Sequence, residues 1–156
     1  ILLGLVGSEM CIRDRRNRDL SMRTRPVMRP VRGGWISSRY GYRLDPVHGK
    51  RVFHRGTDFP GPSGKKILAA ADGVVTESMV RTGYGNIVQI SHADGYVTRY
   101  AHNSKNLVQV GDYVAQGDII ALMGATGRTT GSHLHFEVSR GGKPMNPETL
   151  LRLESR

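Results

Sequence analysis

Apolar and polar residues alternate strictly in the stretch 133–138, whose sequence is HLHFEV. Neighbouring side chains of a β-strand point to opposite faces, so the three apolar residues would share one face and the three polar residues the other. This pattern is typical of a strand with one face against a hydrophobic core. The polar face would present His133, His135 and Glu137, with its two imidazoles side by side.

Short alternating runs separated by turn residues predict further strands along the chain. The stretch 85–103 is expected to form a hairpin whose strands flank the turn sequence HADG. The stretch 65–78 contains an Asp-Gly turn dipeptide. The stretch 108–124 is expected to form two short strands around a Gly-Asp turn. These segments predict a sheet built from many short strands.

Two segments depart from this β pattern. Residues 37–46, SSRYGYRLDP, are rich in Gly, Ser and Pro and are expected to form a loop. Residues 146–154 predict a short terminal helix, with Asn146 as its N-cap and Pro147 at its first position. Twenty glycines and seven prolines among 156 residues agree with many turns. We therefore predict one domain of the all-β, or at least β-rich, class.

The formal net charge of +10 at pH 7 favours an anionic partner. Half of this excess lies in residues 1–34, where eight arginines stand against three acidic residues. The rest of the chain is only moderately basic. It shows no arginine stripe, helix-turn-helix pattern or RNA-recognition motif, so nucleic acid is not an expected partner.

The chain divides into four segments on sequence grounds. Residues 1–15 do not begin with Met, and their charges follow a short apolar run, the reverse of a signal peptide. That run is far shorter than the roughly 20 residues that span a membrane. We expect this segment to be a non-native read-through, with any signal or membrane anchor lost upstream. Residues 16–32 are expected to form an irregular Arg- and Pro-containing lead-in, 33–151 the domain and 152–156 a tail.

Three separate segments contain residues that suit a metal site or acid–base chemistry. One is the histidine pair at 133 and 135, a second supplies His54 and Asp58 in HRGTD, and the third supplies His102 in TRYAHN. Each segment alone also fits an ordinary polar surface. A catalytic zinc site commonly uses three protein ligands and one water. Four histidines and one aspartate suffice for three ligands and two acid–base groups, but their spacing does not decide the roles.

Other residues with similar chemistry are not expected to take part. His48 and His92 fall in predicted loops and are interpreted as ordinary hydrophilic loop residues. Cys11 is the single cysteine. A disulfide within the chain and a cysteine-based zinc site are therefore excluded.

From about residue 33 to residue 151, the sequence resembles the lysostaphin-type zinc metallopeptidases, known as the M23 or LytM-domain family. The resemblance runs in order through SSRYGYRLDPVHGKRVFHRGTDF, AAADGVV, GYGNIVQISHADGYVTRYAH, VGDYVAQGDIIALMGATGRTTGSHLHFEV and NPETLL. It covers nearly the whole expected domain. It implies a compact antiparallel β domain with a groove over a zinc ion.

The resemblance also implies a role for each candidate residue. His54 and Asp58 match the first two zinc ligands of the family, and His135 matches the third. His133 matches the catalytic histidine beside the zinc, and His102 matches its partner. Which of these two accepts the proton of the attacking water stays open.

The family implies a zinc-dependent endopeptidase that hydrolyses peptide bonds in bacterial peptidoglycan. The enzyme would act outside the cytoplasm, and we expect the protein to be a monomer. The bond is expected to be the cross-link between stem peptides, because SSRYGYRLDPVHGKR is most similar to family members from Gram-negative bacteria. A pocket for the acidic stem is expected near Arg43, Lys65 or Lys66.

Two details differ from the usual family pattern. Gly64-Lys65-Lys66 stands where Gly-Thr-Pro is common, and Asn103 where Leu or Met is usual. Both changes bear on groove shape and specificity.

Two alternative functions are weighed against the enzyme. A non-catalytic LytM-type activator of cell-wall amidases is one alternative, but all five chemical positions are filled here. A wall-binding module without activity is the other.

Overall fold

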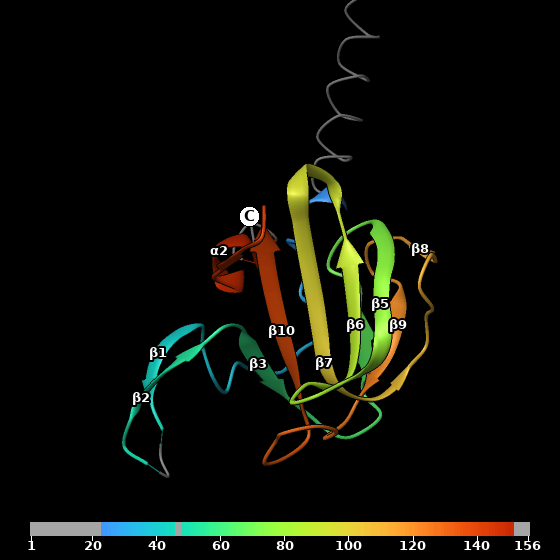
Figure 1. The fold of residues 1–156 in the computed structure, drawn as a ribbon. Coiled ribbons are helices and arrows are strands. Elements are labelled where there is room, and N and C mark those ends of the chain that lie inside the picture. Colours follow the sequence, from blue (N-terminus) through green and yellow to red (C-terminus); the bar gives the residue numbers. More distant parts are fainter. Residues whose placement is uncertain (1–22, 46–47, 152–156) are drawn as a thin grey trace, which may run out of the picture.

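The computed structural model describes residues 23–45 and 48–151. Short β-strands make up most of the secondary structure in these residues (Figure 1). In chain order, the elements are β1 (Gly41–Leu44), β2 (Arg51–His54), β3 (Thr57–Pro60), β4 (Lys66–Leu68), β5 (Gly73–Arg81), β6 (Gly85–Ser91), the 3-10 turn η1 (Ala93–Gly95), β7 (Tyr96–Asn106), β8 (Tyr113–Val114), β9 (Ile119–Met123), β10 (His133–Arg140), β11 (Lys143–Met145) and the helix α2 (Pro147–Leu151).

Nine of these strands form one antiparallel sheet. Its main path runs β11-β10-β7-β6-β5-β8, and β3 adds to β10 beyond the end of β11. β9 pairs with the far end of β7 and with β4. β1 and β2 form a separate two-stranded hairpin beside β3 (Figure 1). The predicted β-rich class is therefore confirmed.

The hydrophobic core lies under the apolar face of β10. Leu134, Phe136 and Val138 are fully or almost fully buried, so the alternation read from the sequence predicted the correct face. Tyr100 of β7 lies against Phe136, with ring centroids 5.3 Å apart. The Tyr100 hydroxyl accepts a hydrogen bond from the Ala70 N–H, which satisfies the polar end of this buried ring.

The hairpin predicted for 85–103 is confirmed, and the loop predicted for 37–46 is wrong. Tyr42 pairs with Phe53 in the β1–β2 hairpin, and their ring centroids are 5.0 Å apart. Residues 41–44 lack a strong strand pattern of their own. The strand forms because β2 supplies both the backbone partners and an aromatic ring to pack against.

The remaining local predictions are also resolved by the structure. Two short strands flank the Gly-Asp turn within 108–124, as predicted, but β8 pairs with β5 whereas β9 pairs with β4 and β7. The terminal helix begins at Pro147, and the Asn146 side chain accepts a hydrogen bond from the Glu148 N–H at 3.0 Å. This confirms the predicted cap.

The expected lead-in lies partly within the described residues. Val27 and Val31 are buried, and the Leu68 N–H donates to the Pro30 carbonyl at 2.7 Å. Residues 27–31 therefore pack against the domain. The expected read-through at 1–15 lies outside the described residues, and the boundary at residue 33 stays a prediction.

Candidate metal centre and active site

β10 brings the candidate residues together because it pairs with a different strand on each side. Its register places His135 opposite Asp58 of β3 and opposite Ala101 of β7. His102 follows Ala101 directly. His133 lies two residues before His135 on the same strand and therefore on the same face. Three segments that are far apart in the sequence thus meet at one place on the sheet.

His54 reaches this place from the end of β2, through the short connection to β3. Gly56 lies in that connection and contacts the backbone of β10. A Cβ atom at Gly56 would lie 2.4 Å from the Phe136 carbonyl oxygen and 3.0 Å from a carbon of the His135 ring. Because glycine has no side chain, the connection can approach β10 closely enough for His54 to face His135.

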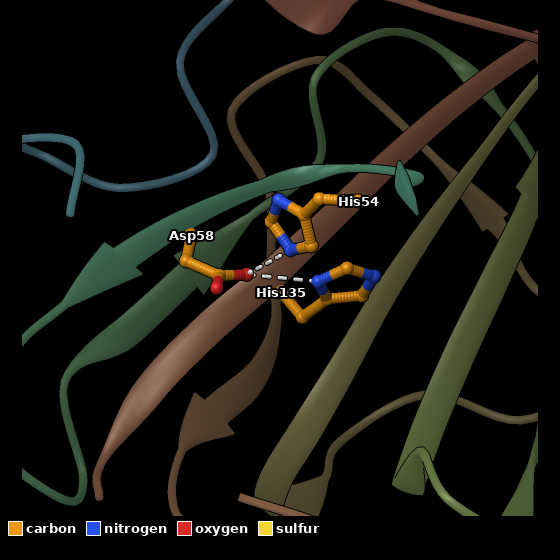
Figure 2. Close-up of side chains that lie close together, drawn as sticks. All are labelled: His54, Asp58 and His135. Atoms are coloured by element: carbon orange, nitrogen blue, oxygen red, sulfur yellow. Dashed lines mark hydrogen bonds and ion pairs between the residues drawn. The ribbon is translucent and has the colours of Figure 1, made fainter. Parts of the chain in front are cut away.

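Two imidazoles converge on a single oxygen of Asp58 (Figure 2). His54 Nε2 lies 3.2 Å and His135 Nδ1 lies 2.8 Å from Asp58 Oδ1. One potential ligand atom from each of the three residues lies within 4.8 Å of the other two. Imidazole nitrogen and carboxylate oxygen are among the ligands that zinc prefers in proteins. The three residues expected to bind metal are therefore together in the structure.

The second nitrogen of each ring determines which atom faces the carboxylate. His54 Nδ1 lies 2.9 Å from the Arg39 carbonyl oxygen, and His135 Nε2 lies 2.9 Å from Glu137 Oε1. Both partners are acceptors, so these nitrogens carry the single N–H of a neutral ring. In their neutral forms, the rings direct lone pairs at Asp58. The three lone-pair donors lie within 4.8 Å of one another, and they repel one another unless a proton or a cation lies between them. This donor set therefore fits a divalent metal.

The same contacts shift the pKa values of the cluster. Burial alone would raise the pKa of Asp58, but hydrogen bonds from His135 and His54 hold it well below its usual range. Burial alone would lower the pKa of His135, but Asp58 and Glu137 outweigh it and raise that pKa to about 9. A proton therefore lies between His135 and Asp58 in the metal-free protein, and metal binding must release it.

His102 and His133 lie next to this cluster and close to each other. Their ring centroids are 4.9 Å apart, and His133 Nε2 lies 3.9 Å from Asp58 Oδ1. Each ring donates its Nδ1 hydrogen to a backbone carbonyl at 2.8 Å, His102 to Thr126 and His133 to Gly131. In both rings, Nε2 is therefore the atom that can accept a proton from another group.

The backbone of His102 adopts a conformation that is rare for residues with a side chain. Its φ is +65°, in the left-handed region, and its N–H donates to the Tyr84 carbonyl at 2.8 Å. Burial lowers the pKa of His102, the hydrogen bond to Thr126 opposes this, and nearby His133 and His135 lower it further. The lowered pKa favours the neutral form of the ring, in which Nε2 can accept a proton.

The other two described histidines do not join the cluster. His48 is exposed in the turn between β1 and β2. His92 is buried, so its interpretation as a hydrophilic loop residue is wrong. Its Nδ1 donates to the Asp72 carbonyl at 2.7 Å, and its Nε2 is bonded to the Thr98 hydroxyl at 2.7 Å. The ring fits because Gly73 has no Cβ: a carbon there would lie 2.8 Å from His92 Nδ1.

Sequence reasoning missed three residues: Glu137, which contacts His135, and its partners Tyr84 and Arg99. Glu137 was placed on the polar face of β10 without a role, and Tyr84 and Arg99 were not singled out. Only Glu137 had a local signal, since its spacing from His135 puts a carboxylate and an imidazole on one strand face. Tyr84 and Arg99 come from other elements, so their proximity depends on strand pairing.

A family model described as peptidase family M23 matches residues 52–147. This range includes the three residues of the metal cluster and the two neighbouring histidines. The chain belongs to peptidase family M23. The resemblance read from the sequence is confirmed.

Curated relatives agree with this M23 assignment. The chain is 45% identical over 112 residues to the DD-carboxypeptidase/endopeptidase Mpg of Neisseria meningitidis, covering 72% of this chain and 26% of that protein. It is 46% identical over 116 residues to the peptidoglycan DD-endopeptidase ShyC of Vibrio cholerae, covering 74% and 27%. The chain thus spans about a quarter of the length of these relatives.

Solved structures share the fold of this M23 domain. A zinc-containing peptidase from Vibrio cholerae superposes with a TM-score of 0.71 at 42% identity, covering 76% of this chain and 38% of that one. The catalytic domain of lysostaphin from Staphylococcus simulans superposes with a TM-score of 0.69 at 32% identity, covering 76% and 92%. Among the described residues, none of the helices is long and apolar enough to cross a membrane.

Proposed function

We propose that this M23 domain is a zinc-dependent endopeptidase that hydrolyses peptide cross-links in bacterial peptidoglycan. The observation that carries the proposal is the convergence of two imidazoles on one carboxylate, with two further histidines beside them. Membership of peptidase family M23 supports it. So does similarity to proteins named peptidoglycan DD-endopeptidases.

In this proposal, His54 Nε2, Asp58 Oδ1 and His135 Nδ1 hold the zinc ion. These atoms already face one another, and hydrogen bonds to the second nitrogen of each ring fix the orientation that ligation needs. Bound zinc lowers the pKa of its water towards neutrality and polarises a substrate carbonyl.

His102 and His133 carry out the proton transfers. Each Nδ1 is hydrogen-bonded to a backbone carbonyl. Each Nε2 is therefore the atom that accepts or donates the transferred proton. One ring takes the proton of the attacking water, and the other stabilises the oxyanion or returns a proton to the leaving amine. Both assignments of these two roles fit the geometry.

The expected substrate is the cross-link between stem peptides rather than a glycine bridge. Stem peptides bear carboxylates, and residues 35–156 contain fifteen basic against ten acidic residues. In the β1–β2 hairpin, Gly41 pairs with His54 and Arg43 pairs with Val52. Arg43 therefore lies on the same face as His54, where its guanidinium suits a stem carboxylate. The reaction would take place outside the cytoplasm, where the wall lies.

The activator and wall-binding alternatives require no turnover. Nothing in the geometry favours them, because the metal cluster and both neighbouring histidines are present together. Digestion experiments separate these alternatives directly.

The test is digestion of purified peptidoglycan by zinc-loaded protein, followed by chromatography of the muropeptides. Cross-linked dimers should fall and uncross-linked monomers should rise, while His133→Ala protein leaves the profile unchanged. Pentaglycine serves as the competing substrate. Persistence of the dimers with cleavage of pentaglycine would refute the cross-link as substrate. No cleavage of either substrate by zinc-loaded protein would refute the enzyme and favour a binding or activator role.

A further inference from the structure

A buried polar cluster lies on the side of His135 that faces away from Asp58. Glu137 is only 7% exposed, and its Oε1 lies 2.9 Å from His135 Nε2. The same oxygen accepts a hydrogen bond from the Tyr84 hydroxyl at 3.0 Å, and Arg99 lies 3.4 Å from Oε2. A buried carboxylate is costly unless it is paired and hydrogen-bonded, and here both of its oxygens have partners.

These contacts restrict both the rotation and the tautomer of the His135 ring. A carboxylate at Nε2 holds the hydrogen on that nitrogen, so the lone pair of the neutral ring lies on Nδ1. Nδ1 is the atom that faces Asp58. Without Glu137, the hydrogen could instead reside on Nδ1, which is the form of the ring that cannot bind a metal through that atom.

Glu137 is itself held in place from two directions. Arg99 lies opposite Glu137 in the pairing of β7 with β10, and its Nε also donates to Gln89 Oε1 at 2.6 Å. Tyr84 lies in the turn before β6 and reaches Glu137 across the face of the sheet. These partners keep the Glu137 carboxylate next to Nε2 and on the far side of the ring from Asp58.

Tyr84 also contacts the neighbouring histidine through its backbone. Its carbonyl accepts the N–H of His102 at 2.8 Å, while its hydroxyl donates to Glu137. One residue therefore joins the support of a metal ligand to the support of an acid–base histidine. Removal of the Tyr84 hydroxyl should therefore weaken the support of His135 through Glu137 and keep the backbone hydrogen bond from His102.

We propose that Glu137, held by Tyr84 and Arg99, is a positioning residue that fixes the His135 ring with Nδ1 towards the metal. The inference rests on the proposed function, because it requires that zinc binds at His54, Asp58 and His135. Glu137 acts only through His135 and does not contact the substrate.

The first readout is zinc affinity, measured by competition with a chromophoric chelator. Glu137→Ala should weaken zinc binding by about 10–100-fold, the effect typical of losing the partner of a ligating histidine. Glu137→Gln should recover most of this loss, because its amide oxygen still accepts the Nε2 hydrogen. Glu77→Ala is the matched control, since Glu77 also pairs with an arginine, at 3.3 Å, but on β5; its zinc affinity should equal that of the wild type.

The second readout is the visible absorption spectrum of cobalt-substituted protein. It should change in Glu137→Ala and return towards the wild-type spectrum in Glu137→Gln, since it reports ligand geometry rather than stability. If Glu137→Ala does not fold, Tyr84→Phe replaces it and should weaken zinc binding by about threefold or more, because one hydrogen bond to a charged group is lost.

Two outcomes would overturn the inference. One is wild-type zinc affinity in folded Glu137→Ala, or in folded Tyr84→Phe where that variant replaces it. The other is a Glu137→Gln protein as impaired as Glu137→Ala. The proposed function fails in a different way. Wild-type protein that binds zinc but cleaves no peptidoglycan would refute the enzyme and leave the role of Glu137 intact, whereas wild-type protein that binds no zinc would overturn both proposals.

Discussion

Asp58 is the residue on which the candidate metal cluster is centred. One of its oxygens contacts His54 and His135, and His133 lies 3.9 Å from the same atom. Each histidine has its other nitrogen bonded to an acceptor. In each ring, the nitrogen nearest Asp58 is therefore the one that is left to bind a metal or a proton.

Substitution of single histidines should separate metal binding from proton transfer. His135→Ala should lose zinc under mild chelation, because one of three protein ligands is removed. His133→Ala and His102→Ala should retain zinc and lose about 10²–10⁴-fold in turnover, the usual contribution of a general acid or base. Zinc content after dialysis and initial rates on peptidoglycan measure the two effects.

His48→Ala is the control for this series, since His48 is exposed in a turn. It should match the wild type in both measurements. Full zinc retention by His135→Ala would show that the ligand assignment is wrong. An active His102→Ala protein would remove that residue from the mechanism.

His92 should contribute to stability rather than to catalysis. Its buried ring joins the Asp72 carbonyl to the Thr98 hydroxyl. His92→Ala leaves these groups without their partner, so the free energy of unfolding should fall by about 1–3 kcal/mol. Turnover well below the melting temperature should stay near normal. Chemical denaturation measures the first quantity, and a dead but folded His92→Ala protein would contradict the assignment.

The stability provided by His92 should depend on pH. Burial lowers the pKa of His92, an effect only partly opposed by Asp72, so the unfolded chain binds the proton more readily than the folded protein. This stability is present above the unfolded pKa of about 6.5 and is lost as the pH falls through the lower folded value. Denaturation curves between pH 7 and 5 should show a smaller pH dependence for His92→Gln than for wild type. Equal dependence would contradict the prediction, and His48→Gln serves as the exposed control.

At the scale of elements, the connection between β2 and β3 positions the metal cluster. β2 delivers His54, β3 delivers Asp58, and β10 delivers His135 to the same place. The connection lies directly against β10 because Gly56 presents no side chain to Phe136. The geometry of the cluster therefore depends on one close backbone contact.

Gly56→Ala should disturb the cluster without changing any ligand. The added carbon would lie 2.4 Å from a backbone oxygen, which cannot rotate away. We expect a stability loss of about 1–3 kcal/mol, typical of an overpacked site, together with weaker zinc binding. Thermal melts and chelator competition measure both quantities.

Gly131→Ala is the matched control, because a Cβ there meets no atom within 4 Å and its φ lies outside the left-handed region. It should bind zinc as the wild type does. Normal zinc affinity in Gly56→Ala would show that the connection can move without affecting the ligands.

At the scale of the whole molecule, the segment before residue 33 makes contacts with the sheet. Val27 and Val31 are buried, and Val31 belongs to the main core cluster. Arg23 pairs with Asp72 at 3.5 Å, and residue 30 accepts a backbone hydrogen bond from β4. Residues between 23 and 31 therefore pack against the domain, and the boundary at residue 33 stays a prediction that truncation tests.

Two truncations should distinguish the expected read-through from the packed lead-in. A chain that starts at residue 16 should retain the melting temperature and the turnover of the longer chain. A chain that starts at residue 33 loses two buried valines, so its free energy of unfolding should fall by about 2–5 kcal/mol. Calorimetry and peptidoglycan digestion measure both variants. A large loss of stability on removal of residues 1–15 would show that this segment belongs to the domain.

The sequence was sufficient for those features that depend on local pattern. Strict alternation predicted the strand at 133–138 and its buried face, and Asn146 with Pro147 predicted the start of α2. The resemblance to M23 peptidases supplied the grouping of His54, Asp58 and His135, which the structure then placed around one oxygen.

Only the tertiary structure decided the features that depend on distant partners. β1 formed where a loop was expected because β2 pairs with it, and His92 became buried beside Gly73. Glu137 acquired a contact with Tyr84, which lies 53 residues away in the chain. Alternation specifies which face of a strand a residue occupies, but the register between strands determines what that residue touches. Register in turn is set by long-range packing, which no single stretch of sequence contains.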